Sequence, residues 1–269
     1  MSRIDTTFTR LRRDNQAAFV AYLSAGDPTM DHTPALVAAL EEAGADIIEL
    51  GLPFSDPLAD GVVNQLAADR ALRAGATTKG VLKMIERIRA TTEIPLVLFT
   101  YLNPVFTYGF EAFHRDAAAA GADGILALDL PPDEADRNAE LLKHEGLQQI
   151  RLIAPTTPAD RLGVIAARAE GFIYYVSRAG VTGVQQDLAT DLVSQVAAIK
   201  VHTEVPVAVG FGIHSPDQAA TVARAADGVV IGSALVRVIE QNPDAPDLAA
   251  KLRAFARPLA DAIHSARKS

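Results

Sequence analysis

The chain has 269 residues, 49% of them hydrophobic, and carries 25 Lys and Arg against 33 Asp and Glu, a net charge of −8. This acidic balance argues against a nucleic-acid-binding surface, which normally needs a basic stripe. The absence of Cys excludes a disulfide framework, a thiol nucleophile and a Cys-ligated metal site. The charged N-terminal segment lacks the apolar core of a secretory signal, and the apolar runs are far shorter than the roughly 18 residues of a membrane span. We therefore expect a cytoplasmic protein that binds neither nucleic acid nor membrane.

Eight short segments rich in β-branched residues alternate with helical patterns along the chain. The sequence predicts strands, in chain order, at 18–26, 45–53, 94–102, 123–131, 147–155, 171–180, 205–213 and 227–235. An Ala-Gly-Ala-Asp sequence occurs at 43–46 and again at 120–123, where a glycine supplies the positive φ of a helix C-cap before a strand begins. Strands that alternate with helices indicate βαβ units and a parallel sheet, and the length is near the roughly 250 residues of one closed barrel. We predict the α/β class and a single (β/α)8 TIM-barrel domain over residues 1–269, with an extra N-terminal helix before Phe19.

Two connections are longer than the fold requires, one at 54–78 after the second strand and one at 177–187 after the sixth. Both fall at the C-terminal face, where barrel enzymes keep their active sites. Glu49 lies in the strand before the first loop, and alternation places Ile48 and Leu50 on the opposite face of that strand. If those two pack on the helices, Glu49 points into the barrel, where burial raises a carboxyl pKa and suits it to proton transfer near neutral pH. The alternative is a buried structural Glu paired with a basic side chain.

Asp60 lies in the loop that directly follows the Glu49 strand. Asp before Gly is an ordinary turn sequence, so the neighbouring Glu49 is what makes Asp60 a candidate. Two carboxylates in different surroundings can divide acid and base roles. Asp129, at the end of the fourth strand, either caps an adjacent loop or belongs to the site.

Glycines gather after the late strands, in the pattern of a phosphate-binding site. Barrel enzymes often bind phosphate with the loops after the seventh and eighth strands and the N-terminus of a short helix. Backbone N–H groups, a hydroxyl and the positive end of that helix would hold the anion without a lysine. The alternative is a set of tight turns without a ligand. The residues concerned are Gly180, Gly183, Gly210, Gly212, Gly232 and Ser233. The six His show no ligand spacing, so we expect no metal site.

The segment IELGLPFSDPLADG at 48–61 resembles the hallmark segment of tryptophan synthase α subunits. The segments SRAGVTG at 177–183, GFGI at 210–213 and GSA at 232–234 match that family in the same order, and the resemblance spans essentially the whole chain. It implies a lyase of tryptophan biosynthesis that cleaves indole-3-glycerol phosphate to indole and glyceraldehyde 3-phosphate by a retro-aldol step. In that case Glu49 is the proton-transferring carboxylate and Asp60 accepts the indole N–H. The substrate contacts implied are Tyr22, Leu126, Tyr174, Thr182, Gly183, Phe211, Gly212, Gly232 and Ser233.

The same resemblance implies a partner, because in this family indole passes to a separate β subunit in an α2β2 assembly. Pyridoxal phosphate (PLP) is then the cofactor of the β subunit, and none is expected in this chain. The surface that resembles the partner-facing one consists of Pro53, Phe54, Asp56, Asn103, Pro104 and Phe106.

Four positions depart from the family pattern. Val62 and Asn64 stand where a proline and an apolar residue are usual, and Tyr22 and Thr100 also differ from common choices. The first pair leaves the dynamics of the Asp60 loop open. Two other functions also stay open: a barrel that mainly activates the β subunit, and a different phosphate-binding barrel of amino-acid biosynthesis.

Overall fold

The computed structural model describes residues 1–130, 132–177, 185–210 and 212–267, with the backbone alone at 132–133, 159 and 185–191. Its strands form one parallel sheet in the order β5-β4-β3-β2-β1-β9-β8-β7-β6. They are β1 (Ala18–Ser24), β2 (Ile47–Gly51), β3 (Leu96–Thr100), β4 (Gly124–Ala127), β5 (Gln148–Gln149), β6 (Arg151–Ile153), β7 (Ile173–Val176), β8 (Val207–Gly210) and β9 (Gly228–Ile231).

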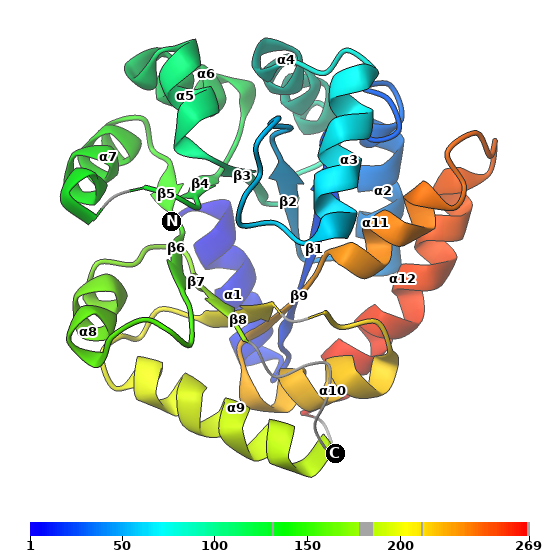
Figure 1. The fold of residues 1–269 in the computed structure, drawn as a ribbon. Helices are drawn as coiled ribbons and strands as arrows, with labels where there is room; N and C mark the ends of the chain where they lie inside the picture. Colours follow the sequence, from blue (N-terminus) through cyan, green and yellow to red (C-terminus); the bar gives the residue numbers. More distant parts are fainter. Residues whose placement is uncertain (131, 178–184, 211, 268–269) are drawn as a thin grey trace.

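Helices alternate with the strands and surround them (Figure 1). The first half of the chain holds α1 (Arg3–Arg13), α2 (Thr33–Ala43), α3 (Val62–Arg73), α4 (Thr78–Arg89), α5 (Leu102–Tyr108) and α6 (Phe110–Ala120). The second half holds α7 (Pro132–His144), α8 (Ala159–Ala167), α9 (Gln185–Lys200), α10 (Pro216–Ala225), α11 (Ser233–Glu240) and α12 (Leu248–Ser265).

The sheet closes at the fifth predicted strand, which is split in two. β5 pairs with β4 and β6 pairs with β7, and Ile150 alone separates β5 from β6. Its N–H donates to the carbonyl of Ile125 at 3.0 Å, which continues the pairing with β4. The two ends of the strand order are therefore joined through one residue, and the predicted barrel is confirmed.

Side chains alternate between the barrel interior and the helices along each strand. On β2, Ile48 and Leu50 pack in the large apolar cluster between the sheet and the helices, whereas Ile47 packs in a second cluster inside the barrel. Glu49 is on the same face as Ile47, since side chains two residues apart share a face. It therefore points inward, as the strand pattern predicts.

The extra N-terminal helix covers the N-terminal ends of the strands. Its buried Ile4, Phe8 and Leu11 join the cluster inside the barrel, and the ring of Phe8 lies 5.8 Å from that of Phe172. In Figure 1 this helix lies behind the centre of the ring of strands. Because α1 fills this end, the opposite end of the barrel is the one left for a ligand.

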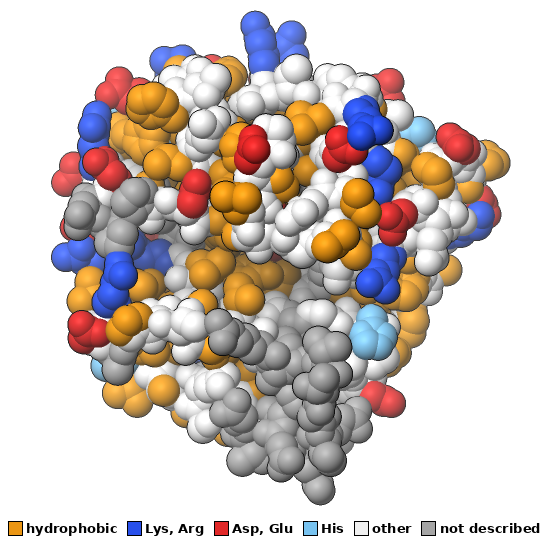
Figure 2. All heavy atoms as spheres, viewed as in Figure 1, with side chains coloured by type: hydrophobic (Ala, Val, Ile, Leu, Met, Phe, Trp, Pro, Cys, Tyr) orange, Lys and Arg blue, Asp and Glu red, His pale blue; other side chains and the backbone are white. Residues whose placement is uncertain are grey.

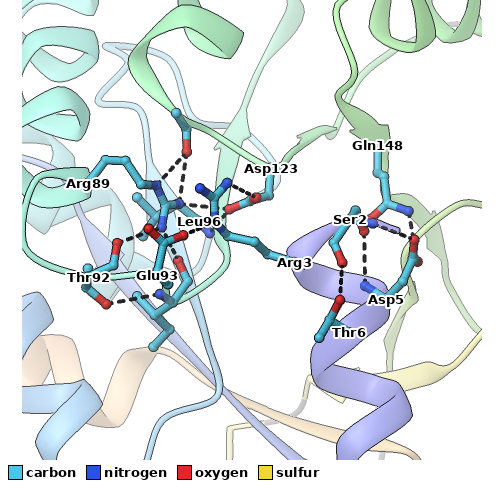
Figure 3. Close-up of polar contacts among 12 residues, drawn as sticks. Ser2, Arg3, Asp5, Thr6, Arg89, Thr92, Glu93, Leu96, Asp123 and Gln148 are labelled. Carbon is cyan, nitrogen blue, oxygen red and sulfur yellow. Dashed lines mark hydrogen bonds and ion pairs between the residues drawn. The ribbon is translucent and has the colours of Figure 1, made fainter.

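Ion pairs fix α1 to this end of the barrel (Figure 3). Asp123 accepts from Arg3 at 3.1 Å and from Arg89 at 2.8 Å, and Asp46 accepts from Arg10 at 2.7 Å. These two aspartates end the two Ala-Gly-Ala-Asp sequences, and each also accepts from a backbone N–H of the preceding strand. The repeated sequence thus ends one helix, begins the next strand and anchors α1.

Candidate active site at the C-terminal face of the barrel

Glu49 is a fully buried carboxyl group inside the barrel. It lies beside Tyr22 of β1 and Val97 of β3 in the strand register, and none of its surface is exposed. Neither carboxyl oxygen has a hydrogen-bond partner among the described residues. Burial raises the pKa of Glu49 to about 8, because a charge is poorly solvated in an apolar interior. Glu49 is therefore a neutral acid at neutral pH, and no basic side chain of the described residues accounts for its burial.

Asp60 is half-buried, and a tyrosine that the sequence analysis did not single out holds it. The Tyr101 hydroxyl donates to Asp60 Oδ2 at 2.9 Å and accepts from the N–H of Ala59 at 2.9 Å. Burial raises the pKa of Asp60, while hydrogen bonds from Tyr101 and Asn64 oppose that rise. Tyr101 directly follows β3, so it could have been recognised as a hydroxyl group at the C-terminal end of a barrel strand.

Two phenols face both carboxyl groups. Burial, together with the charges of Asp60 and Glu49, raises the pKa of Tyr22. The same causes raise the pKa of Tyr174. Phe99 lies between these rings, 5.2 Å from Tyr22 and 6.3 Å from Tyr174 between centroids. The sequence-predicted Glu49, Asp60, Tyr22 and Tyr174 therefore converge on one region of the barrel mouth.

Glycines make room for the two phenols. A methyl group at Gly51 would meet the Tyr22 hydroxyl, and one at Gly210 would meet the Tyr174 hydroxyl. Tyr175, the neighbour of Tyr174, points to the helices and donates to Gln195 of α9 at 2.7 Å.

Two of the predicted phosphate-binding positions lie at the start of α11. Gly232 is the N-cap and Ser233 the first residue of this helix, and a Cβ at Gly232 would lie 3.3 Å from Tyr22 Cβ. Gly212 has a φ of +52° and open space where a side chain would be. Leu126 is fully buried inside the barrel, beside Phe99 in the register of β3 and β4. The predicted Gly180, Thr182, Gly183 and Phe211 lie outside the described residues.

Asp129 accepts a hydrogen bond from the N–H of Leu102 at 2.6 Å. Leu102 is the first residue of α5, so the Asp129 carboxylate caps that helix. Asp129 thus acts as a cap, but on the helix after β3 and not on the loop before Pro131 that the sequence suggested.

The predicted partner surface is partly exposed. The Phe106 side chain is 74% exposed, Asp56 and Asn103 are exposed, and Phe54 is half-buried with its ring 5.5 Å from that of Tyr101. Two members of the set, Pro53 and Pro104, are instead buried within the chain. Figure 2 shows the molecule from the same side as Figure 1, and on this side hydrophobic side chains gather around a hollow in the middle.

Two kinds of structure are absent from the described part of the chain. It contains no group of three or more His, Cys, Asp or Glu side chains arranged to hold a metal ion. It also contains no helix with the length and apolar character needed to cross a membrane.

The fold and the site define a (β/α)8-barrel enzyme with a neutral carboxylic acid buried at the mouth of the barrel and a second, half-buried carboxyl group on the loop that follows the same strand. The profile of the family "Tryptophan synthase alpha chain" matches residues 8–264. The chain is 51% identical over 257 residues to the tryptophan synthase alpha chain of Opitutus terrae, which covers 95% of this chain and 97% of the relative. It is 47% identical to that of Geobacter sulfurreducens, over 98% of this chain and 99% of the relative.

Solved structures agree with these relatives. The tryptophan synthase subunit alpha of Legionella pneumophila superposes with a TM-score of 0.90 at 40% identity, over 98% of each chain. A chain of Mycobacterium tuberculosis tryptophan synthase does so with a TM-score of 0.88 at 38% identity, again over 98% of each. The chain belongs to the tryptophan synthase alpha chain family, and it is a lyase of tryptophan biosynthesis.

Proposed function

We propose that Glu49 and Asp60 carry out the reaction of this family in this chain, the cleavage of indole-3-glycerol phosphate to indole and glyceraldehyde 3-phosphate. The observation that supports this role is the burial of Glu49 without a hydrogen-bond partner among the described residues, which raises its pKa to about 8. A carboxyl with that pKa can hold a proton at neutral pH and still release it to a substrate atom.

The cleavage needs one proton to move onto the indole ring and one to leave the glycerol chain. Neutral Glu49 gives its proton to C3 of the indole, and the ring nitrogen becomes positively charged. Asp60 accepts the N–H at that nitrogen and stabilises the charge, which matters most where water is excluded. The Glu49 carboxylate then takes the proton of the hydroxyl next to C3. The carbon–carbon bond breaks, its electron pair returns to the ring, and indole and the aldehyde are released.

The phosphate of the substrate would bind at the glycines after the late strands. Gly232 and Ser233 begin α11, whose positive end favours an anion. Gly212, in the loop after β8, leaves open space where a side chain would be. The remaining predicted contact, Gly183, belongs to the same proposed site. Local backbone groups must supply this attraction because the chain as a whole carries a charge of −8.

The indole ring would lie between the aromatic side chains of the barrel mouth. Tyr22 and Tyr174 flank this region, and Leu126 lies below it within the barrel. Phe211 would form a further wall, and Thr182 would contact Asp60 when its loop closes over the substrate and excludes water.

A PLP-dependent β subunit is the proposed partner, in an α2β2 assembly in which this chain carries no cofactor of its own. The surface named above supports this proposal, since its Phe106, in the helix α5 that follows β3, is 74% exposed. Leu58, in the loop that follows β2, is 90% exposed beside that surface in sequence. Both segments border the proposed active site, since Tyr101 at the start of α5 contacts Asp60 in the loop after β2, so indole would leave close to the partner. We also propose that residues 1–269 form a single domain and that the protein is cytoplasmic, like other biosynthetic enzymes that use soluble metabolites.

Indole release from indole-3-glycerol phosphate by the purified chain tests the proposal. Wild-type protein should release indole, and Glu49→Gln should release none while it still binds the substrate, as measured by calorimetry. Glu86→Gln, a change of the same chemistry at an exposed position of α4, is the matched control. Indole release by Glu49→Gln at the wild-type rate would refute the role of Glu49.

A further inference from the structure

The Tyr22 side chain lies between the two ends of the proposed active site. In the strand register, Tyr22 of β1 is next to Glu49 of β2 on one side. On the other side, the register pairs Ala21 with Ile231 of β9. The next step along the strands brings Tyr22 level with Gly232, where a Cβ would lie 3.3 Å from Tyr22 Cβ. Since β1 lies between β2 and β9, Tyr22 separates the buried acid from the start of α11.

The ring of Tyr22 points into the barrel, and its hydroxyl turns toward β2. Val20, two residues earlier on β1, packs in the cluster inside the barrel, and side chains two residues apart share a face. The hydroxyl lies against the backbone of Gly51, where a methyl group would collide with it. Gly51 is two residues after Glu49 and lies on the same face of β2. The hydroxyl is therefore just beyond the acid, on the side of the barrel mouth.

This hydroxyl is available to a ligand. It makes no hydrogen bond to another described residue, whereas the Tyr101 hydroxyl donates to Asp60. Burial and the nearby carboxyl groups raise the pKa of Tyr22, so the phenol keeps its proton at neutral pH and can donate it in a hydrogen bond. Tyr22 also keeps 7% of its surface exposed, whereas Glu49 keeps none. The barrel mouth thus holds a hydrogen-bond donor that the described part of the chain does not use.

We propose that Tyr22 is a specificity-determining residue, whose hydroxyl donates a hydrogen bond to a hydroxyl of the glycerol chain of the substrate. The inference rests on the proposed function, which puts the phosphate at Gly232 and C3 of the indole at Glu49. The glycerol chain joins these two groups, so it passes β1 at Tyr22. A phenylalanine ring could pack against this chain in the same way, but only a tyrosine can recognise its hydroxyls. Tyr22 is also a position at which this chain departs from the family pattern.

A ligand without the glycerol hydroxyls isolates this contact. Indole-3-propanol phosphate keeps the indole ring, the phosphate and a chain of three carbons, but it has no hydroxyl for Tyr22 to bind. The loss of one hydrogen bond between neutral groups weakens binding by about three- to tenfold. Part of the preference of the wild-type chain for the substrate over this analogue should therefore come from Tyr22.

Tyr22→Phe tests the proposal, because it removes the hydroxyl and keeps the ring. Calorimetry gives the affinities for indole-3-glycerol phosphate and for the propanol analogue in the Glu49→Gln background, in which the substrate is not cleaved. We expect substrate binding to weaken about fivefold and binding of the analogue to change less than about twofold. With Glu49 in place, kcat/KM for indole release should fall by a similar factor.

Tyr108→Phe is the matched control, since the Tyr108 hydroxyl donates to Asp116 of α6, away from the barrel mouth. It should leave the affinities for both ligands unchanged. Equal weakening of both ligands by Tyr22→Phe would show a packing role and overturn the proposal. Unchanged affinity of Tyr22→Phe for both ligands would overturn it as well.

The binding measurements separate this inference from the proposed function. A wild-type chain that binds both ligands but releases no indole would reject the reaction assigned to Glu49, while the comparison of the two ligands still decides the role of Tyr22. Binding of both ligands without a selective loss in Tyr22→Phe would reject the inference alone. A wild-type chain that binds neither ligand would reject both.

Discussion

The substitution Glu49→Gln exchanges a carboxyl group for a neutral amide of the same shape. The barrel interior opposes the ionisation of that carboxyl group. Burial raises the pKa of Glu49 from 4.5 to about 8, so the folded chain binds this proton more tightly than the unfolded chain does. The contribution of the bound proton to the free energy of unfolding is fully present below pH 4.5 and is lost as the pH rises to about 8. Each pH unit in this interval corresponds to about 1.4 kcal/mol. Between pH 4.5 and about 8, the free energy of unfolding of the wild-type protein should therefore fall by roughly 5 kcal/mol relative to that of Glu49→Gln.

Urea unfolding of both proteins at about pH 5 and about pH 9 measures this difference. The two should have similar free energies of unfolding at the lower pH, and Glu49→Gln should be several kcal/mol more stable at the higher pH, while inactive. Glu86→Gln, on the exposed face of α4, should follow wild type at both pH values. A free-energy difference between wild type and Glu49→Gln that is the same at both pH values would refute the reasoning, because a pH-independent difference reports packing and not ionisation.

Three further changes test the surroundings of the site. Tyr101→Phe removes a donor to Asp60, so kcat should fall about tenfold and the acid limb of the pH profile should move to higher pH; a limb that stays in place would contradict the assigned contact. Gly210→Ala places a methyl group against the Tyr174 hydroxyl, and the free energy of unfolding should fall by about 1–3 kcal/mol with a loss of substrate affinity; wild-type values of both would argue against the close packing. Phe106→Ser, at a 74% exposed position, should weaken binding of the β subunit about tenfold, with thermal unfolding unchanged; wild-type affinity in a titration with the β subunit would remove Phe106 from the interface.

The fold could be predicted from the sequence because its signals are local. Eight runs of β-branched residues and the helix-ending glycines Gly44 and Gly121, both with positive φ, place the strands and helix ends without knowledge of their neighbours. The break between β5 and β6 at Ile150 could not be predicted, since it depends on which strand each backbone group pairs with. The anchoring of α1 by Arg3 and Arg10 likewise depends on distant aspartates that only the folded chain brings close.

The direction of a side chain in the candidate site could be predicted only where its position along a strand decides it. Alternation places Glu49 opposite the apolar Ile48 and Leu50, and the structure has these two against the helices. Alternation also places Tyr174 and Tyr175 on opposite faces of their strand, but only the family resemblance indicates that Tyr174 is the inward one. Loop residues gave no such signal. The contact between Tyr101 and Asp60 joins two loops 41 residues apart, and the burial of Pro53 depends on tertiary packing.

The ionisation of Glu49 in the folded chain tests the central claim most directly. Infrared difference spectra between wild type and Glu49→Gln, recorded across neutral pH, report whether this carboxyl carries a proton. We predict the carbonyl band of a neutral carboxylic acid at neutral pH, replaced by carboxylate bands as the pH rises past about 8. A carboxylate signal from Glu49 already present at mildly acid pH would contradict a dry, neutral acid at the barrel mouth.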